Sequence, residues 1–275
     1  MSSSEGANAV LFDGTRCIGC RACSVACKSW NKNPADTDKE TSVEGGIEGK
    51  AVVSDKTLTF MRFREIGDGD DLKWAFGKVQ CMHCLKPGCE TACIVGALHR
   101  KKATGAVTYD KQKCIGCRYC MVACPFGIPT YQWEERMPWI RKCTFCSDRL
   151  NEAENGMAPA CVTACPTHAM EFGDRDELIE KAWARINAAP EGKYVRHVYG
   201  EKEVGGTAWM YISPVDMTEL DFPWLSEEPV TKNARTAMGL LPYYATGMLA
   251  LMAGIYFITK RKQKIAAGKH EEKKG

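Results

Sequence analysis

The sequence has little net charge and lacks the motifs that mark common enzymes. Its 37 Lys and Arg residues against 34 Asp and Glu leave a formal net charge of +3. No block of Lys and Arg is interleaved with aromatic residues, so we expect no nucleic-acid partner. The chain also has no Ser-His-Asp set, no phosphate-binding loop and no dinucleotide fingerprint. We therefore expect no catalytic activity from this chain alone.

The N-terminus lacks the features of a secretory signal. Its first residues, Met-Ser-Ser-Ser-Glu-Gly-Ala-Asn, have no basic start and no apolar run. Dense disulfides are typical of secreted scaffolds. The consecutive C-x2-C spacings of this chain are moreover too short for all of its cysteines to pair locally without strain. The sequence therefore favours another use for its thiols.

Cysteine is abundant, at 16 of 275 residues. The cysteines form four groups of four with none left over: Cys17, Cys20, Cys23 and Cys27; Cys81, Cys84, Cys89 and Cys93; Cys114, Cys117, Cys120 and Cys124; Cys143, Cys146, Cys161 and Cys165. The first and third groups read C-x2-C-x2-C-x3-C, and Pro125 follows the third. This run binds a [4Fe-4S] cluster in bacterial ferredoxins. Sixteen ligands predict four [4Fe-4S] clusters.

Structural zinc is the main alternative. The C-x2-C pairs of the second and fourth groups are also typical of zinc knuckles. A third cysteine after two further residues, as in the first and third groups, has no place in a zinc ribbon. The spacing therefore favours iron-sulfur clusters over zinc.

An internal repeat supports the ferredoxin interpretation. Residues 16–27 and 113–124 are identical at nine of twelve positions. Each is preceded by a run typical of a strand, residues 9–13 and 106–110, whose last residue is an Asp four positions before the first cysteine. The pattern predicts a duplicated ferredoxin-like unit.

In two-cluster ferredoxins, the last cysteine of one run binds the other cluster. Applied here, the rule predicts four ligand sets: set 1 is Cys17, Cys20, Cys23 and Cys165; set 2 is Cys27, Cys143, Cys146 and Cys161; set 3 is Cys81, Cys84, Cys89 and Cys124; set 4 is Cys93, Cys114, Cys117 and Cys120. The second and third groups are close in sequence, which fixes sets 3 and 4. The 14 residues between Cys146 and Cys161 leave other pairings open for the outer sets 1 and 2.

Charged and histidine side chains accompany the ligands. Six cations stand within a few residues of cysteines, where they either offset cluster charge or lie solvated at the surface: Arg21, Lys28, Arg118, Arg141, Lys142 and Arg149. His83 and His168 flank cysteines and could act as ligands of a Rieske-type centre. Because cysteines already supply every cluster, we expect both histidines to pack around the clusters.

Outside the cysteine groups the chain has four recognisable segments. Residues 28–56 are polar and glycine-rich, which predicts a loop, and residues 57–65 alternate as in a strand. Asp174 is predicted to cap a helix that buries Leu178, Ile179, Ala182, Trp183 and Ile186 and ends at Pro190. Residues 213–235 contain three prolines, which predicts an extended arm lying on another surface.

Residues 236–259 contain no charged side chain. As a helix, these 24 residues would extend about 36 Å at about 1.5 Å per residue, enough for a hydrocarbon core of about 30 Å. A membrane span is favoured over a buried soluble helix. Seven Lys and Arg follow the span and two precede it within twenty residues. The positive-inside rule then places the C-terminus in the cytoplasm and the cluster domain on the periplasmic side.

Three stretches together resemble a known family: residues 114–126, residues 141–146, and residues 198–207, which read VYGEKEVGGT. The chain resembles the iron-sulfur (beta) subunit of membrane-bound molybdenum or tungsten formate dehydrogenases, and residues 198–207 are equally similar to the ferredoxin-like subunit of membrane [NiFe] hydrogenases. The resemblance implies an electron relay from a molybdopterin-containing catalytic subunit towards a membrane cytochrome b that reduces quinone. In formate dehydrogenase the catalytic subunit carries the twin-arginine export signal for both.

The expected fold is α+β, with two ferredoxin-like bis-[4Fe-4S] units in one cluster domain and a single C-terminal transmembrane helix in the inner membrane. The expected segments are 1–74, the first part of the outer unit; 75–130, the inner two-cluster unit; 131–212, the rest of the outer unit; 213–235, the arm; 236–259, the span; and 260–275, a basic tail.

Overall fold

The computed structural model describes residues 7–34, 52–69, 72–151 and 157–272. The chain divides into two units, Met1–Val230 and Thr231–Gly275. The first unit mixes helices and strands, as predicted. Most of the predicted loop 28–56 lies outside the described residues, and its first three residues belong to the helix α1 (Ala22–Trp30).

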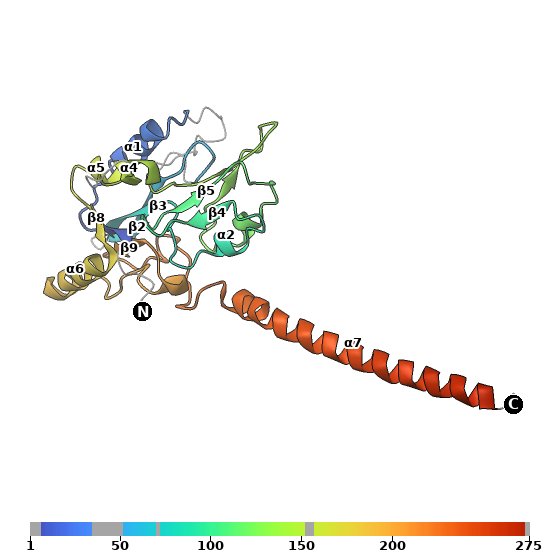
Figure 1. The fold of residues 1–275 in the computed structure, drawn as a ribbon. Coiled ribbons are helices and arrows are strands. Elements are labelled where there is room, and N and C mark those ends of the chain that lie inside the picture. Colours follow the sequence, from blue (N-terminus) through green and yellow to red (C-terminus); the bar gives the residue numbers. More distant parts are fainter. Residues whose placement is uncertain (1–6, 35–51, 70–71, 152–156, 273–275) are drawn as a thin grey trace. The chain divides into compact units, whose positions relative to one another are not determined.

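A three-stranded sheet joins the two ends of the first unit. Its order is β8 (Met170–Asp174), β1 (Asn8–Asp13) and β9 (Trp209–Ile212). The central strand β1 is antiparallel to β8 and parallel to β9. This pairing brings the fourth cysteine group, which precedes β8, beside the first, which follows β1. Figure 1 shows β8 and β9 together, at the side of the unit that carries α6.

The helix α6 (Arg175–Ala188) covers one face of this sheet. The carboxylate of Asp174 accepts hydrogen bonds from the backbone N–H groups of Asp176, at 2.9 Å, and Glu177, at 3.3 Å. These bonds satisfy N–H groups that have no partner within the helix. Leu178, Ala182 and Ile186 are buried against the sheet, so the predicted cap and apolar face are confirmed.

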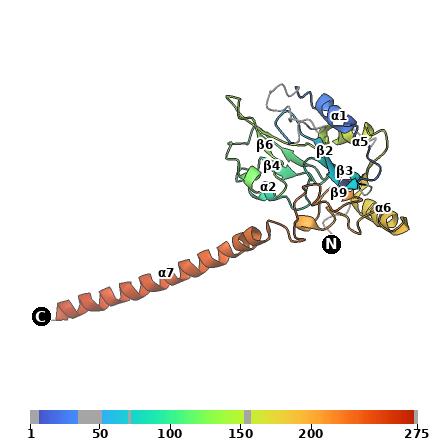
Figure 2. The same cartoon turned by 180° about the vertical axis from the view of Figure 1, so that it is seen from behind.

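The remaining elements are hairpins and short helices that carry the cysteine loops. The hairpins pair β2 (Phe60–Ile66) with β3 (Lys73–Val79), β4 (Leu98–Arg100) with β5 (Val107–Tyr109), and β6 (Thr130–Tyr131) with β7 (Ile140–Arg141). The short helices are α2 (Gly88–Thr91), α3 (Tyr119–Val122), α4 (Ser147–Asn151) and α5 (Ala160–Thr163). The predicted strand at 57–65 begins three residues later, at Phe60. In both views α1 and α5 lie side by side, and α2 lies with β4 away from them (Figures 1 and 2).

The glutamate-glycine stretch at residues 198–207 has a structural role. The buried carboxylate of Glu203, in the short 3-10 helix Glu203–Gly205, accepts from the backbone N–H of Gly200 at 2.7 Å and lies 2.6 Å from His197 Nε2. Burial alone would raise the pKa of Glu203, but these hydrogen bonds hold it below its usual value. Gly200 has φ 94°, and a Cβ there would lie 2.3 Å from the carbonyl oxygen of Trp209. The stretch thus turns the chain tightly into β9.

The predicted arm packs on the chain's own core. Val215, Met217, Leu220 and Phe222 are buried and belong to the largest apolar cluster, which also contains Tyr211. The surface on which this part of the arm lies is therefore that of the first unit of the same chain. The last four residues of the predicted arm, 232–235, are helical because α7 begins at residue 232.

The second unit consists mainly of the helix α7 (Lys232–Glu272), which has Pro242 in its interior. Within the described residues, Thr236–Lys264 is the single helical stretch long and apolar enough to cross a membrane. It contains the predicted span, and the helix continues through the basic segment that follows. The chain therefore carries one C-terminal helix with the properties of a membrane anchor.

Candidate metal centres

The four C-x2-C loops share one backbone conformation. The residue two positions after the first cysteine has a positive φ in every loop: 65° at Gly19, 48° at His83, 72° at Gly116 and 59° at Phe145. Two of these residues are not glycine, and side chains rarely adopt this region. At Gly19 an added Cβ would lie 2.7 Å from the ring of Phe63, so glycine is required there. The second and fourth groups are therefore structural counterparts of the first and third.

This conformation turns backbone N–H groups toward sulfur. The N–H groups of Gly19, Gly116 and Phe145 each donate to the Sγ of the cysteine two residues earlier, at 3.4 Å in every case. The N–H of Ala97 donates to Cys93 Sγ at 3.1 Å. Hydrogen bonds to cluster sulfurs are one of the means by which proteins set cluster potentials. The loops are thus built to hold thiolates.

All sixteen cysteines are free thiols, and fifteen of them are buried or half-buried, with Cys20 exposed. Across the described part of the chain, no three Cys, His, Asp or Glu side chains converge closely enough to hold a single metal ion. Thiolates around one zinc ion would lie only about 3.8 Å apart, given tetrahedral Zn–S bonds of about 2.3 Å. Among the described residues the structure therefore contains no preformed site for a single zinc ion.

The structure brings Cys165 of the fourth group close to the first group. Burial foremost, together with nearby Cys23, Cys165 and Cys20, raises the pKa of Cys17 to about 11. These four are the cysteines predicted for set 1. A thiol that retains its proton so strongly must lose it on binding iron, because the ligand is the thiolate.

The cysteines predicted for set 2 line one narrow cavity. Its walls include Cys27, Cys143, Cys146 and Cys161. Burial raises the pKa of Cys27 to about 12, and Cys161 and Cys146 contribute to this rise. The structure therefore places Cys27 of the first group beside three cysteines of the fourth group.

The structure also places Cys124 of the third group near cysteines of the second group. Burial, followed by the proximity of Cys81, Cys124 and Cys89, raises the pKa of Cys84. Cys124 comes from the third group and the other three from the second. These are the cysteines of set 3.

The cysteines predicted for set 4 also lie near one another. Burial foremost, together with nearby Cys93, Cys114 and Cys117, raises the pKa of Cys120 to about 11. Cys93 is the last cysteine of the second group. Each of the four sets thus contains three cysteines from one group and one from its partner group.

Two buried lysines lie among the ligands. Lys78 lines the set 2 cavity, and its Nζ donates to Thr59 Oγ1 at 2.8 Å and Gln80 Oε1 at 2.9 Å. Burial alone would lower the pKa of Lys78, but the surrounding thiols, Cys161 and Cys23 foremost, raise it above its ordinary value. The sequence analysis missed this residue, although it precedes Cys81 by only three positions.

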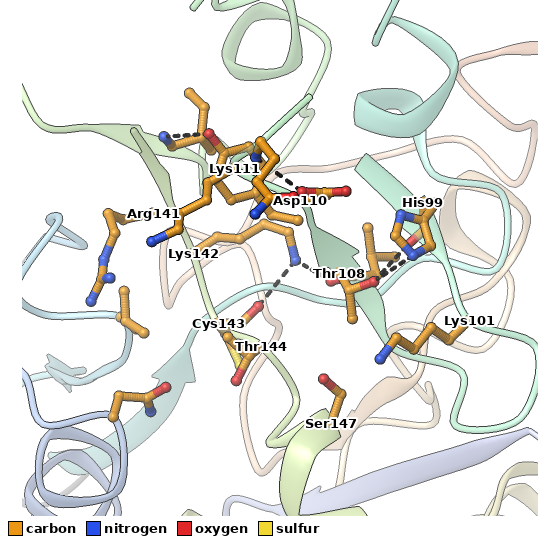
Figure 3. Close-up of a pocket in the computed structure, with 16 residues that line it drawn as sticks. His99, Lys101, Thr108, Asp110, Lys111, Arg141, Lys142, Cys143, Thr144 and Ser147 are labelled. Atoms are coloured by element: carbon orange, nitrogen blue, oxygen red, sulfur yellow. Dashed lines mark hydrogen bonds between the residues drawn. The ribbon is translucent and has the colours of Figure 1, made fainter. Parts of the chain in front are cut away.

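Lys142 lies beside set 3. Its buried Nζ is 3.8 Å from Cys81 Sγ and donates to the carbonyl oxygen of Cys143 at 3.0 Å and to that of Val107. Figure 3 shows the bond to Cys143 within a cavity that Lys101, Lys111 and Arg141 also line. Lys142 therefore links a set 3 sulfur to the backbone of a set 2 ligand.

The other predicted cations engage aromatic or polar groups. The guanidinium of Arg21 lies 4.9 Å from the centre of the Phe63 ring, and that of Arg118 lies 5.0 Å from the centre of the Trp133 ring. Arg149 lies over Trp30, Arg141 donates to Asn33 Oδ1 and to the Asp55 carbonyl oxygen, and Lys28 donates to the Pro34 carbonyl oxygen. Of the six predicted cations, Lys142 is the one for which a hydrogen bond to a cysteine sulfur is observed.

The two histidines occupy different environments. His83 is fully buried, its ring lies 4.8 Å from that of Phe145, and its Nδ1 accepts the backbone N–H of Val107 at 2.9 Å. Burial and the cations Lys142, Arg100 and Lys78 lower its pKa, so the ring is neutral and its proton lies on Nε2. Within the described residues Nε2 has no partner. His168 is exposed, directly follows a turn and has φ 49°.

The residues present fit iron-sulfur clusters. Sixteen free thiols lie in and around the four C-x2-C loops, backbone N–H groups donate to four of the sulfurs, and the buried lysines Lys78 and Lys142 lie beside them. The buried N–H groups of His83 Nε2 and Trp209 Nε1 lack protein acceptors among the described residues. Such donors require an acceptor in the interior, and cluster sulfurs can accept hydrogen bonds.

Comparison with known proteins agrees with this chemistry. Residues 72–175 match the model of the 4Fe-4S dicluster domain family. This region includes the second, third and fourth cysteine groups and ends at the start of α6.

Individual relatives match over almost the whole chain. The iron-sulfur subunit of the nitrate-inducible formate dehydrogenase of Escherichia coli K12 is 37% identical over 253 residues, which cover 90% of this chain and 83% of that protein. The formate dehydrogenase-O iron-sulfur subunit of the same organism is 36% identical, over 90% of this chain and 81% of its own length. The hydrogenase-2 operon protein HybA of Escherichia coli O157:H7 is 31% identical, over 94% and 86% of the two chains.

Proposed function

The chain belongs to the family of formate dehydrogenase iron-sulfur subunits, which includes HybA, and from this premise we propose that it carries four [4Fe-4S] clusters and relays electrons between a catalytic subunit and a membrane partner. As in its relatives, the role is electron transfer within an oxidoreductase complex and not catalysis. The observation that carries the proposal is the presence of sixteen free thiols in and around four C-x2-C loops whose third residue has a positive φ.

We propose the ligand sets as the spacing predicts them: Cys17, Cys20, Cys23 and Cys165; Cys27, Cys143, Cys146 and Cys161; Cys81, Cys84, Cys89 and Cys124; Cys93, Cys114, Cys117 and Cys120. The mutual proximity of cysteines within each set supports this assignment. Segments 1–74 and 131–212 would then form the outer ferredoxin-like unit, and 75–130 the inner one.

The sets follow one another in a row. Cys23 of set 1 lies near Cys161 of set 2. Cys143 of set 2 lies near Cys81 of set 3, and Cys89 of set 3 lies near Cys120 of set 4. The row places sets 1 and 4 at the two ends, so electrons would enter at one end and leave at the other.

In this mechanism the protein residues would hold the clusters, orient them and shield them from water. Each [4Fe-4S] cluster supplies a one-electron carrier without an open coordination site, since four thiolates bind its irons. The cysteines supply these thiolates, and the loop N–H groups stabilise their negative charge. Phe145 and Trp209 line the set 2 cavity and Tyr211 is buried beside Trp209, so these side chains would keep water away from set 2.

The proposed partners follow from the family. We propose a molybdopterin-containing catalytic subunit at one end and a cytochrome b subunit at the other. The helix α7 would cross the inner membrane once, through the lipid bilayer, with its basic C-terminal segment in the cytoplasm and the cluster unit in the periplasm. The apolar stretch Thr236–Lys264 supports the anchor.

A second candidate is the same relay in a membrane [NiFe] hydrogenase. The similarity to HybA, named as a hydrogenase-2 operon protein, favours considering it. The higher identity of 37% to a formate dehydrogenase subunit, against 31% to HybA, favours the first candidate.

Metal analysis of the intact complex tests the proposal. The complex would be isolated from membranes in mild detergent through a tag on this chain, and Fe, Mo, W, Ni and Zn would be measured per chain. We expect at least about sixteen Fe, since each cluster contains four, together with Mo or W. Nickel without Mo or W would favour the hydrogenase candidate, and zinc in place of iron would contradict both.

A further inference from the structure

Lys78 and Lys142 are buried cations without an acidic partner. Their exposed fractions are 1% and 6%. Lys78 Nζ bonds to a hydroxyl and an amide oxygen, and Lys142 Nζ contacts backbone carbonyls and one sulfur. Through the described ranges of the chain, neither Nζ has a carboxylate oxygen within 4.0 Å.

An uncompensated charge in a protein interior is strongly unfavourable. Negative charge near each lysine would offset this penalty, and among the described groups around the two lysines the cysteine sulfurs can provide it. Lys78 faces the set 2 cavity and lies 4.5 Å from the centre of the Trp209 ring. Lys142 Nζ lies 3.8 Å from Cys81 Sγ of set 3. The compensating charge thus belongs to the two middle sets.

In the described part of the chain, the predicted cations beside the two end sets are arginines that are less buried than these lysines. Near set 1, the half-buried Arg21 is stacked on Phe63, and near set 4 the exposed Arg118 is stacked on Trp133. Arg118 is exposed, so solvent screens its charge. Arg21 is half-buried, with its Nη2 atom enclosed by protein. A buried ammonium group keeps more of its field, because the interior has a lower effective dielectric constant than water.

We propose that Lys78 and Lys142 raise the reduction potentials of the clusters bound by sets 2 and 3, so that the middle of the row retains an electron more strongly than it would without them. An oxidised [4Fe-4S] core of about +2 with four thiolates has a net charge of about −2, and one-electron reduction makes it about −3. A fixed neighbouring cation therefore stabilises the reduced form more than the oxidised form. The inference depends on the proposed function, since it requires clusters at both sets.

A redox titration of the intact complex, followed by electron paramagnetic resonance, tests the inference. Lys78→Met and Lys142→Met keep the length of the aliphatic chain and remove the charge. We expect each variant to lower the equilibrium constant for reduction of one cluster at least about tenfold. This corresponds to a fall of about 59 mV in the reduction potential of that cluster for a one-electron step. The double variant should shift two of the four steps.

Lys111→Met is the matched control. Lys111 lines the same cavity as Lys142 (Figure 3), but its side chain is exposed. Removal of a solvated charge should leave all four steps in place. Four clusters with unshifted potentials in both Lys78→Met and Lys142→Met would overturn the inference.

A second pair of variants provides the test for a methionine variant that fails to bind its cluster. If a methionine variant loses iron, Lys78→Arg and Lys142→Arg decide the question, because they keep the charge and change the shape. Retention of the cluster in the arginine variants supports an electrostatic role, and equal loss in both pairs refutes it. The wild-type complex separates the two proposals, because absence of any reducible cluster there would contradict the proposed function itself.

Discussion

Replacing Cys89 and Cys124 together by alanine should cost the protein the same single cluster as replacing either one alone. Both belong to set 3, although they lie in different sequence groups, and Cys84 has both nearby. A cluster that has lost one thiolate ligand is already disrupted, so the second substitution has nothing further to remove. The number of intact clusters, measured by iron, sulfide and electron paramagnetic resonance, should fall from four to three in all three variants.

The matched control pairs Cys124 with its neighbour in sequence. Cys120 and Cys124 share a group but belong to sets 4 and 3, so Cys120→Ala with Cys124→Ala should remove two clusters. The opposite pattern, with two clusters lost in the Cys89 pair and one in the Cys120 pair, would show that each sequence group binds its own cluster. The same comparison can be made for sets 1 and 2. Cys27→Ala with Cys161→Ala should remove one cluster, and Cys27→Ala with Cys23→Ala should remove two.

Leu249→Arg should release the chain from the membrane to a large extent. Leu249 lies near the middle of the apolar stretch of α7 and its side chain is exposed. A charged residue at the centre of a spanning helix costs about 2.5–3.5 kcal/mol in insertion, roughly a hundredfold in the equilibrium. The fraction of the chain that remains in membranes after carbonate extraction measures this effect.

Thr259→Arg is the control for that prediction. The same side chain is introduced next to Lys260, at the end of the apolar stretch, where a long basic side chain can extend to the lipid surface. Membrane retention should then remain at the wild-type value. Equal retention of both variants would mean that α7 does not cross the hydrocarbon core.

Local features of the fold could be predicted from the sequence because short-range chemistry determines them. The cap at Asp174 and the buried face of α6 depend on residues within one helix. The C-x2-C loops depend on spacing and, in two of four cases, on a glycine. The apolar stretch of α7 is evident from the absence of charge.

Long-range features could not be predicted in this way. The sheet order β8-β1-β9 pairs strands separated by more than 150 residues, and no local pattern encodes that pairing. The burial of Val215, Met217, Leu220 and Phe222 depends on the apolar surface around Tyr211, which exists only in the folded unit. Lysine is rarely buried without a partner, so nothing in the sequence distinguishes Lys78 from an exposed strand residue. Its role is evident only once the thiols gather around it.

The most direct test of the account is the number of electrons that the purified complex stores in this chain. The sample would be titrated with dithionite under anaerobic conditions and followed by the bleaching of absorbance at about 400 nm and by electron paramagnetic resonance, with reducible centres of other subunits counted separately. The account predicts four one-electron steps per chain, from four [4Fe-4S] clusters. A chain that accepts no electrons, or that holds about sixteen iron atoms and accepts fewer than four electrons at any potential reached, would contradict it.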